Sequence, residues 1–254
     1  MWGQSGDPRL PWKGRDLEKT VIVAFSDVHA PRYLPLLSKA LQGYQGPDPC
    51  IVVMAGDLVD KGKYLMMNPL LKLVKSRFPG AKLVAVFGNE EYESVRGALR
   101  RSYNEVDWLD DEFRVYECGD LRVAIVGTQG ALEKPTKWQA RNMPHLFKVY
   151  RERPRAIASL ISHAKRESDI VVLASHYALS RETVKGEDPR VWPYLYSGLM
   201  ERVVAEAKPH IAIHGHAHKG SPFAIVSGVP VFNVALPLNK RIVRVFPPQD
   251  FKLL

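Results

Sequence analysis

Cysteine is scarce in this sequence, with only Cys50 and Cys118 among 254 residues. The two lie far apart along the chain, and neither belongs to a CxxC pair that could begin a zinc or redox site. A disulfide-dense scaffold and a thiolate zinc site are therefore excluded. Because both cysteines lie within or beside apolar runs, we expect two reduced thiols in the core.

Long hydrophobic runs are also missing. No stretch approaches the ~20 consecutive apolar residues that span a bilayer. The N-terminal segment MWGQSGDPRLPWKGRDLEK carries prolines and charges where a secretory signal peptide needs an apolar stretch. We therefore expect a soluble, cytoplasmic protein that has no membrane partner.

Acidic residues are outnumbered, because 27 Asp and Glu face 36 Lys and Arg, and the formal net charge is +9. Such an excess favours encounters with polyanions such as nucleotides or nucleic acid. No RRM, KH or zinc-finger motif organises the basic residues. Basic residues on solvent-exposed helix faces would explain the positive charge about as well as a polyanionic partner would. Nucleic acid is therefore retained only as an alternative partner.

Short β-branched runs alternate with segments of helical spacing in the first half of the chain. Strands are predicted at 20–27, 50–57 and 82–89, with helices between them and another at 91–103. This β-α-β-α-β order is typical of parallel strands joined by crossover helices. The runs on either side of Gly119-Asp120 predict an antiparallel hairpin.

The second half begins with a polar stretch at 128–153, followed by a basic amphipathic helix that runs to about residue 165. Strands are then predicted at 169–176 and 210–216, and the last three apolar runs resemble an antiparallel meander. No linker or internal repeat divides the sequence. We expect one α/β domain over 1–254, with a core at 20–247 and two insertions at 128–155 and 177–197 near the site described next.

Side chains able to bind metal follow five predicted strands directly. In open α/β sheets the carboxyl ends of the strands line one crevice, so these side chains are expected to converge. Carboxylate, amide and imidazole ligands without a thiolate suit Mn, Fe, Zn, Co or Ni. Seven ligands are too many for one tetrahedral ion and fit two divalent ions that share a carboxylate. The candidates are Asp27, His29, Asp57, Asn89, His176, His216 and His218.

The motifs that contain these residues resemble, in order, the five signature blocks of calcineurin-like metallophosphoesterases, in particular archaeal-type members. The blocks are Asp27-Val28-His29, Gly56-Asp57-Leu58-Val59-Asp60, Gly88-Asn89-Glu90-Glu91, His176 and Gly215-His216-Ala217-His218. The resemblance implies a four-layer α/β/β/α sandwich of two mixed sheets. It also implies phosphoester hydrolysis by a hydroxide that two metal ions activate, and we favour manganese.

The resemblance assigns roles by position. Asp27, His29 and His218 would bind one ion, and Asn89, His176 and His216 the other. Asp57 would bridge the two ions, and His216 would also stabilise charge on the phosphoryl oxygens. Asp60 resembles a residue that orients a ligand. Arg32, Arg181 and Arg190 are candidates for substrate contact, and His214 is expected to lie behind the ligands.

One block departs from the family pattern, which commonly has a histidine where this chain has Glu90. That histidine is thought to protonate the leaving oxygen or to steady the phosphate, and loss of a general acid commonly costs ~10² to 10⁴ in rate. Three alternatives stay open. Burial keeps Glu90 protonated as the catalytic acid, another residue such as His145 or Tyr177 replaces it, or the substrate needs no acid.

These observations predict a metal-dependent hydrolase of a phosphorylated small molecule or nucleotide, with phosphodiesters slightly favoured. Two alternatives accompany this prediction. One is a binding or scaffold protein that keeps the fold with weakened catalysis, for which Glu90 is the support. The other is a nuclease, for which the net charge of +9 is the support.

Overall fold

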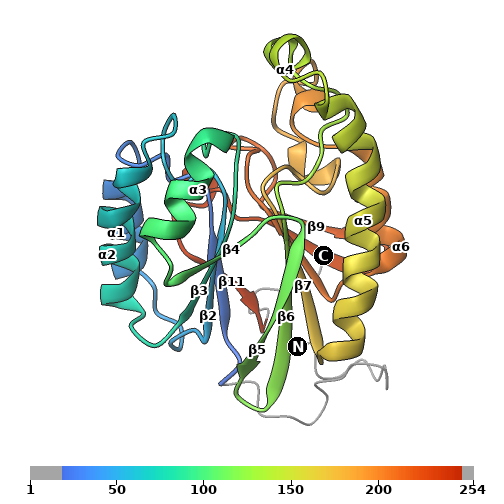
Figure 1. Cartoon of the computed structure of the whole chain (residues 1–254). Helices are drawn as coiled ribbons and strands as arrows, with labels where there is room; N and C mark the ends of the chain where they lie inside the picture. Colours follow the sequence, from blue (N-terminus) through green and yellow to red (C-terminus); the bar gives the residue numbers. More distant parts are fainter. Residues whose placement is uncertain (1–18, 248–254) are drawn as a thin grey trace.

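The computed structural model describes residues 19–247. The N-terminal residues that argue against a signal peptide therefore lie almost wholly outside the described range. Within that range two β-sheets pack face to face, and helices cover both outer surfaces (Figure 1). The predicted α/β/β/α sandwich of two mixed sheets is confirmed. No helix of the described part is both long and apolar enough to cross a membrane.

The first sheet has the strand order β11-β1-β2-β3-β4, in which only β11 is antiparallel to its neighbour. Helices α1, α2 and α3 cover its outer face, where Leu37, Leu70 and Leu99 pack against alternate strand residues. The strands are β1 (Ile22–Phe25), β2 (Ile51–Ala55), β3 (Lys82–Val86), β4 (Val106–Leu109) and β11 (Val243–Phe246). The helices are α1 (Leu34–Gln42), the short η1 (Tyr64–Met66), α2 (Met67–Arg77) and α3 (Glu93–Ser102).

The second sheet has the order β5-β6-β7-β8-β10-β9. Helices α5 and α6 cover its outer face, where Ile157, Ile161 and Val204 are buried. Its strands are β5 (Glu112–Cys118), β6 (Leu121–Thr128), β7 (Ile170–Ser175), β8 (Ile211–His214), β9 (Phe223–Val226) and β10 (Val229–Asn233). Its helices are α4 (Lys137–Asn142), α5 (Leu146–Glu167), η2 (Glu182–Val184), η3 (Trp192–Tyr194) and α6 (Gly198–Ala207). Helix α7 (Leu236–Asn239) follows β10 in the chain, but its Leu236 packs into the outer core of the first sheet.

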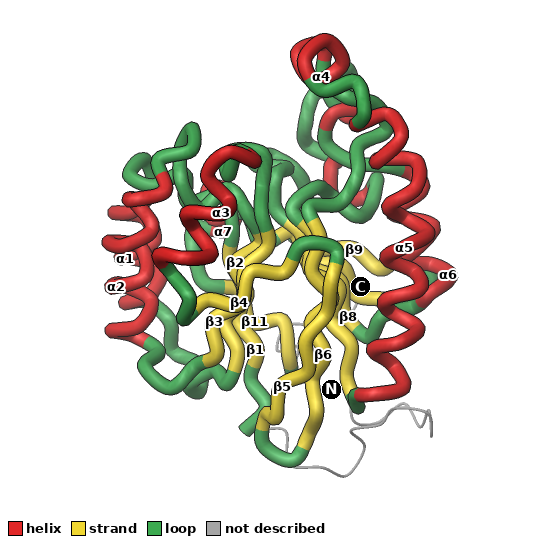
Figure 2. The backbone as a smooth tube through the Cα atoms, in the orientation of Figure 1, coloured by secondary structure: helices red, strands yellow, loops and turns green. Residues whose placement is uncertain are grey.

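The space between the sheets is filled by the inward side chains of both, among them Val53 and Val84 of the first sheet and Ile125 and Val172 of the second. Alternate residues of the central strands face the helices instead, so these strands are buried on both sides. This explains why they read as continuous apolar runs in the sequence. The tube view shows the loops gathered above the strand ends, where the site lies (Figure 2).

Three sequence predictions about these elements need correction. Strand β4 is absent from the predicted elements, because its four residues are too few for a recognisable alternation. The last strand, β11, does not continue a meander: it crosses to the first sheet and pairs with β1, where Val245 and Phe246 enter the inner core. Helix α4 and the start of α5 lie within the polar stretch at 128–153, for which no helix was predicted.

The expectation of two reduced thiols is also wrong, because Cys50 and Cys118 form a disulfide. Cys50 directly precedes β2 in the first sheet, and Cys118 ends β5 in the second. The sandwich brings these two positions together, with 5.8 Å between their Cα atoms. Sequence separation alone could not show this proximity, since it depends on how the two sheets face each other.

Candidate metal centre

All seven predicted ligands gather at the carboxyl ends of strands from both sheets. Asp27, Asp57 and Asn89 follow β1, β2 and β3, whereas His176 follows β7 and both His216 and His218 follow β8. Within the second sheet the β7 and β8 loops are tied together here, because Gly215 N–H donates to the carbonyl of His176 at 3.1 Å. The fold therefore converts five separated motifs into one cluster.

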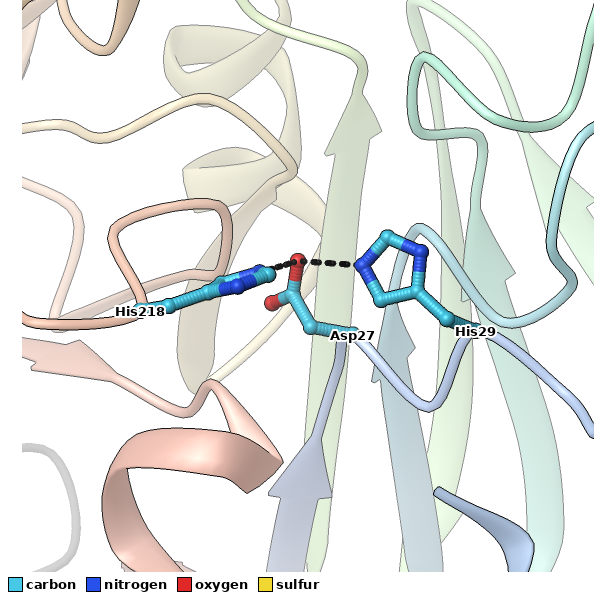
Figure 3. A group of neighbouring side chains, drawn as sticks. All are labelled: Asp27, His29 and His218. Atoms are coloured by element: carbon cyan, nitrogen blue, oxygen red, sulfur yellow. Dashed lines mark hydrogen bonds and ion pairs between the residues drawn. The ribbon is translucent and has the colours of Figure 1, made fainter. Parts of the chain in front are cut away.

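The first group of side chains is Asp27, His29 and His218 (Figure 3). Both histidines point toward the same oxygen of Asp27. The distance from His218 Nε2 to Asp27 Oδ1 is 2.9 Å, and from His29 Nε2 to the same atom it is 3.9 Å. The other oxygen, Oδ2, accepts from Ser26 Oγ at 2.5 Å and from His216 N–H at 3.0 Å. Oδ2 is thus occupied by hydrogen bonds from the protein, whereas Oδ1 faces the two imidazoles.

The second group is Asp57, His176 and His216, and the amide of Asn89 joins it. His176 Nε2 lies 3.2 Å from Asn89 Oδ1 and 3.5 Å from Asp57 Oδ1. His176 Nδ1 lies 3.0 Å from the carbonyl of Ala55, which fixes the proton on Nδ1 and leaves Nε2 free to bind. His216 Nε2 lies 3.2 Å from the carbonyl of Tyr194, which in the same way leaves its Nδ1 free.

Asp57 lies between the two groups. Its Oδ2 is 3.7 Å from His29 Nε2, and its Oδ1 is 3.5 Å from His176 Nε2. His29 Nε2 is buried and has no hydrogen-bond partner among the described residues, which is costly for a polar atom unless something else binds it. An electron-pair acceptor between these carboxylates would satisfy that nitrogen. The chemistry of the residues present therefore fits a cation.

The backbone holds several of these residues in the left-handed region, with φ of 58° at Asp27, 42° at His29, 49° at Asp57 and 69° at His216. Two glycines make the close packing feasible. A Cβ atom at Gly88 would collide with the Asp57 carboxylate, and one at Gly215 would collide with that of Asp27. The glycines before Asn89 and His216 are thus a steric requirement of the site.

Electrostatics at the cluster favour positive charge. Burial opposes ionisation of Asp27, but the hydrogen bond from His218 and the charge of His176 outweigh it and lower the pKa of the carboxyl. Burial likewise opposes protonation of His176, but the charge of Asp57 and their contact raise its pKa to about 9. Burial and the charge of His176 lower the pKa of His216 to about 4. A metal ion would supply the charge that a proton on His176 supplies otherwise.

Glu91 has a role that the sequence did not reveal. Its carboxylate is fully buried and accepts four backbone N–H groups, from Asp57, Leu58 and Val59 of the second motif and from Gly88 of the third, at 2.7 to 3.0 Å. Burial and the charge of Asp57 raise the pKa of Glu91 to about 7. The carboxylate of Glu91 therefore ties together the two loops that carry Asp57 and Asn89.

Glu90 lies beside the cluster and is half-buried. Its Oε2 accepts the N–H of Lys61 at 2.7 Å, and its own N–H donates to Asp57 Oδ1 at 2.8 Å. Glu90, Asp60 and His29 form a third close group, in which Asp60 also pairs with Lys63 at 3.0 Å. Asp60 therefore lies next to the predicted ligand His29.

The three arginines suggested for substrate contact are exposed, and each lies against a neighbouring side chain. Arg32 is exposed and lies against the ring of Tyr33, and Arg181 lies over the ring of Trp192. Arg190 pairs with Asp188, and 87% of its side chain is exposed. None of them lines the cavity beside the cluster among the described residues. His214 does lie behind the ligands, fully buried, with Nε2 2.7 Å from Thr183 Oγ1.

The two residues considered as replacements for the missing histidine both line that cavity. Tyr177 is buried, and its ring centre is 5.0 Å from that of His216. Burial and the neighbouring Tyr150 raise the pKa of Tyr177 well above its usual range, so its hydroxyl keeps its proton. His145 is exposed at the start of α5.

The family model of the calcineurin-like phosphoesterases matches residues 20–220. The chain therefore belongs to the calcineurin-like phosphoesterase family, and it is a hydrolase of phosphoric esters. A search of curated proteins found no match.

Solved structures share the fold at low sequence identity. A phosphopantetheinyl hydrolase from Mycobacterium tuberculosis is 16% identical with a TM-score of 0.69, and the match covers 91% of this chain and 98% of that one. A dimetal phosphatase from Danio rerio is 11% identical with a TM-score of 0.57, over 85% and 87% of the two chains. A putative 5'-nucleotidase from Staphylococcus aureus is 17% identical with a TM-score of 0.55, over 84% and 48%.

Proposed function

We propose that this protein is a phosphodiesterase that works with two divalent metal ions. The observation that carries the proposal is the convergence of seven metal-binding side chains from five strand ends of both sheets. Asp27, His29 and His218 would hold one ion, and Asn89, His176 and His216 the other. Asp57 would touch both. Oxygen and nitrogen donors without sulfur suit Mn, Fe, Zn, Co or Ni, and manganese is our first choice among them.

The bound ions would supply an activated water and would neutralise charge on the phosphoryl oxygens. The residues around them hold the ligands in place. Ala55 and Tyr194 carbonyls fix the protons of His176 and His216 on the nitrogens that face away from the cluster. Glu91 fixes the loop that carries Asp57, and Ser26 fixes the carboxylate of Asp27.

The slight preference for diesters rests on the net charge of +9 and on Glu90, which stands where the family commonly has a histidine. Its carboxylate accepts the Lys61 N–H, so it is engaged as an acceptor beside the cluster. The family histidine would be a proton donor at that position, and without it a poor leaving group departs slowly. An ester with a good leaving group is less affected. Phosphopantetheinyl groups and nucleotides, which the names of two similar structures mention, are starting points for a substrate screen.

Metal content and turnover test this proposal together. Purified protein equilibrated with Mn²⁺ and freed of excess metal should hold two ions per chain and hydrolyse bis-p-nitrophenyl phosphate faster than p-nitrophenyl phosphate. Asp57→Asn should hold one ion or none and lose at least ~10²-fold in kcat, because it removes the shared ligand. Asp188→Asn, at an exposed carboxylate far along the 177–197 loop, is the matched control. Wild-type turnover no faster than that of Asp57→Asn would refute the enzyme proposal.

A further inference from the structure

A cavity of about 1140 Å³ opens directly beside the candidate metal centre. Its lining includes Asn89 and His216 of the second group and, within residues 19–247, no member of the first group. Its lining residues come in part from α3, from α4 and from the start of α5. Figure 1 shows that these elements lie on either side of the strand ends. A phosphoester held at the metal centre would therefore have an adjoining space for one of its organic groups.

The wall formed by the 128–155 insertion is largely hydrocarbon. Leu132, Met143, Leu146 and Val149 line it, and the indole of Trp138, which is 65% exposed, lies at its edge. Several polar groups of this wall already have partners within the protein. Thr136 and Gln139 form a reciprocal helix cap, and Gln139 also donates to the hydroxyl of Tyr150.

The two arginines in the lining are engaged as well. Arg96 donates to Asp110, to Gln129 and to the carbonyl of Glu91, and its guanidinium lies over the ring of Phe87. Arg153 donates to Asp111 at 2.8 Å and to the carbonyl of Gly130 at 2.6 Å. A second phosphate in the cavity would have to break these pairs, although the chain as a whole is basic.

We infer that this cavity binds an organic group of the substrate, and that this group is a neutral, extended and largely hydrocarbon chain. The inference rests on the proposed function for the position of the phosphate. It differs from a site for a polyphosphate tail, since such a tail needs free cations and both arginines of the lining are engaged. The volume is ample for one small-molecule group, because ligand pockets commonly measure ~300 to 1000 Å³.

Binding of alkylphosphonates, which are not hydrolysed, tests the inference by calorimetry on the full chain with Mn²⁺. Octylphosphonate should bind at least ~10-fold more tightly than methylphosphonate, because each methylene that leaves water contributes to affinity. AMP should bind more weakly than octylphosphonate. Equal affinity for the two phosphonates would overturn the inference, and AMP binding more tightly than octylphosphonate would overturn it in favour of a nucleobase pocket.

A pair of variants locates the effect. Met143→Glu places a charge in the hydrocarbon wall and should reduce the octyl-to-methyl ratio to about two or less. Phe147→Glu makes a comparable change at a side chain that is 56% exposed and does not line the cavity, so the ratio should stay at the wild-type value. Thermal melting should show that both variants fold. If the octyl-to-methyl ratio of Met143→Glu stays at the wild-type value, or if it falls equally in both variants, the hydrocarbon chain does not bind in this cavity.

Failure of this inference and failure of the proposed function are distinguishable. The binding measurement needs no turnover, so an inactive protein that still selects octylphosphonate would refute only the enzyme proposal. An active protein without chain-length selection would refute only the cavity assignment. Fluorescence of Trp138 gives a readout without metal: octylphosphonate should change the emission of metal-free protein, and Trp138→Phe should remove most of that change.

Discussion

Single residues at the metal centre are held in conformations that they rarely adopt. Asp27, His29 and Asp57 all have positive φ, and each such residue costs on the order of 1 kcal/mol or more. Contacts around them must offset this cost. The carboxylate of Glu91 is the strongest of these contacts near Asp57, because it accepts N–H groups from that residue and from the next two.

Glu91→Gln should therefore destabilise the protein by about 3 kcal/mol. The glutamine has one acceptor oxygen, so two of the four backbone N–H groups would face an amide N–H₂ instead. The urea midpoint measures the stability, and Mn²⁺ calorimetry should show weaker binding as the Asp57 loop loosens. Glu93→Gln, at an exposed residue two positions later, should change neither quantity. If both variants behave alike, the carboxylate of Glu91 is not what holds the loop.

At the scale of elements, β7 and β8 are joined by a side chain as well as by their ladder. His210, just before β8, accepts the N–H of Val171 in β7 through Nδ1 at 2.8 Å. Burial and the charge of Lys165 lower the pKa of His210 to about 4, whereas histidine in an unfolded chain has a pKa of about 6.5. The folded state thus needs the neutral ring. This contribution to stability is complete above pH ~6.5 and is lost as the pH falls toward ~4.

His210→Asn keeps an acceptor for Val171 but cannot be protonated in this range. Between pH ~7.5 and pH ~5 it should lose up to about 2 kcal/mol less stability than the wild type. Urea denaturation at both pH values measures the difference. His163→Asn, at an exposed histidine on α5, should follow the wild type. Equal losses in wild type and His210→Asn would mean that other groups set the acid sensitivity.

Elements with strong local signals could be predicted from the sequence, and those that depend on distant partners could not. Strands β1, β2, β3 and β7 are buried on both faces, so their apolar runs and the ligands after them were recognisable. Strand β11 follows two strands of the second sheet but pairs with β1 of the first sheet, and no local sequence pattern indicates this pairing. For α4 a signal did exist, since Thr136 and Gln139 have the spacing of a capping box. The role of Glu91 depends on N–H groups over thirty residues away and was not predictable.

At the scale of the whole molecule, the sheets are joined at both ends of the sandwich. The candidate metal centre joins them at the carboxyl ends of the strands, and the Cys50–Cys118 disulfide joins them at the start of β2 and the end of β5. The disulfide closes a loop with a sequence separation of 68 residues. In the chain-entropy treatment such a loop contributes about 4 kcal/mol, largely by restricting the unfolded chain.

Reduction should therefore lower the melting temperature of the protein by about 10 °C while the fold survives. Calorimetry with and without dithiothreitol measures this shift. The double variant Cys50→Ser/Cys118→Ser should melt at the lower temperature and should not respond to dithiothreitol. Because the metal centre lies at the opposite end of the strands, Mn²⁺ should raise the melting temperature of the oxidised protein and of the double variant by similar amounts. If untreated protein, once denatured, contains two titratable thiols, then Cys50 and Cys118 are not joined by a disulfide and this prediction is wrong.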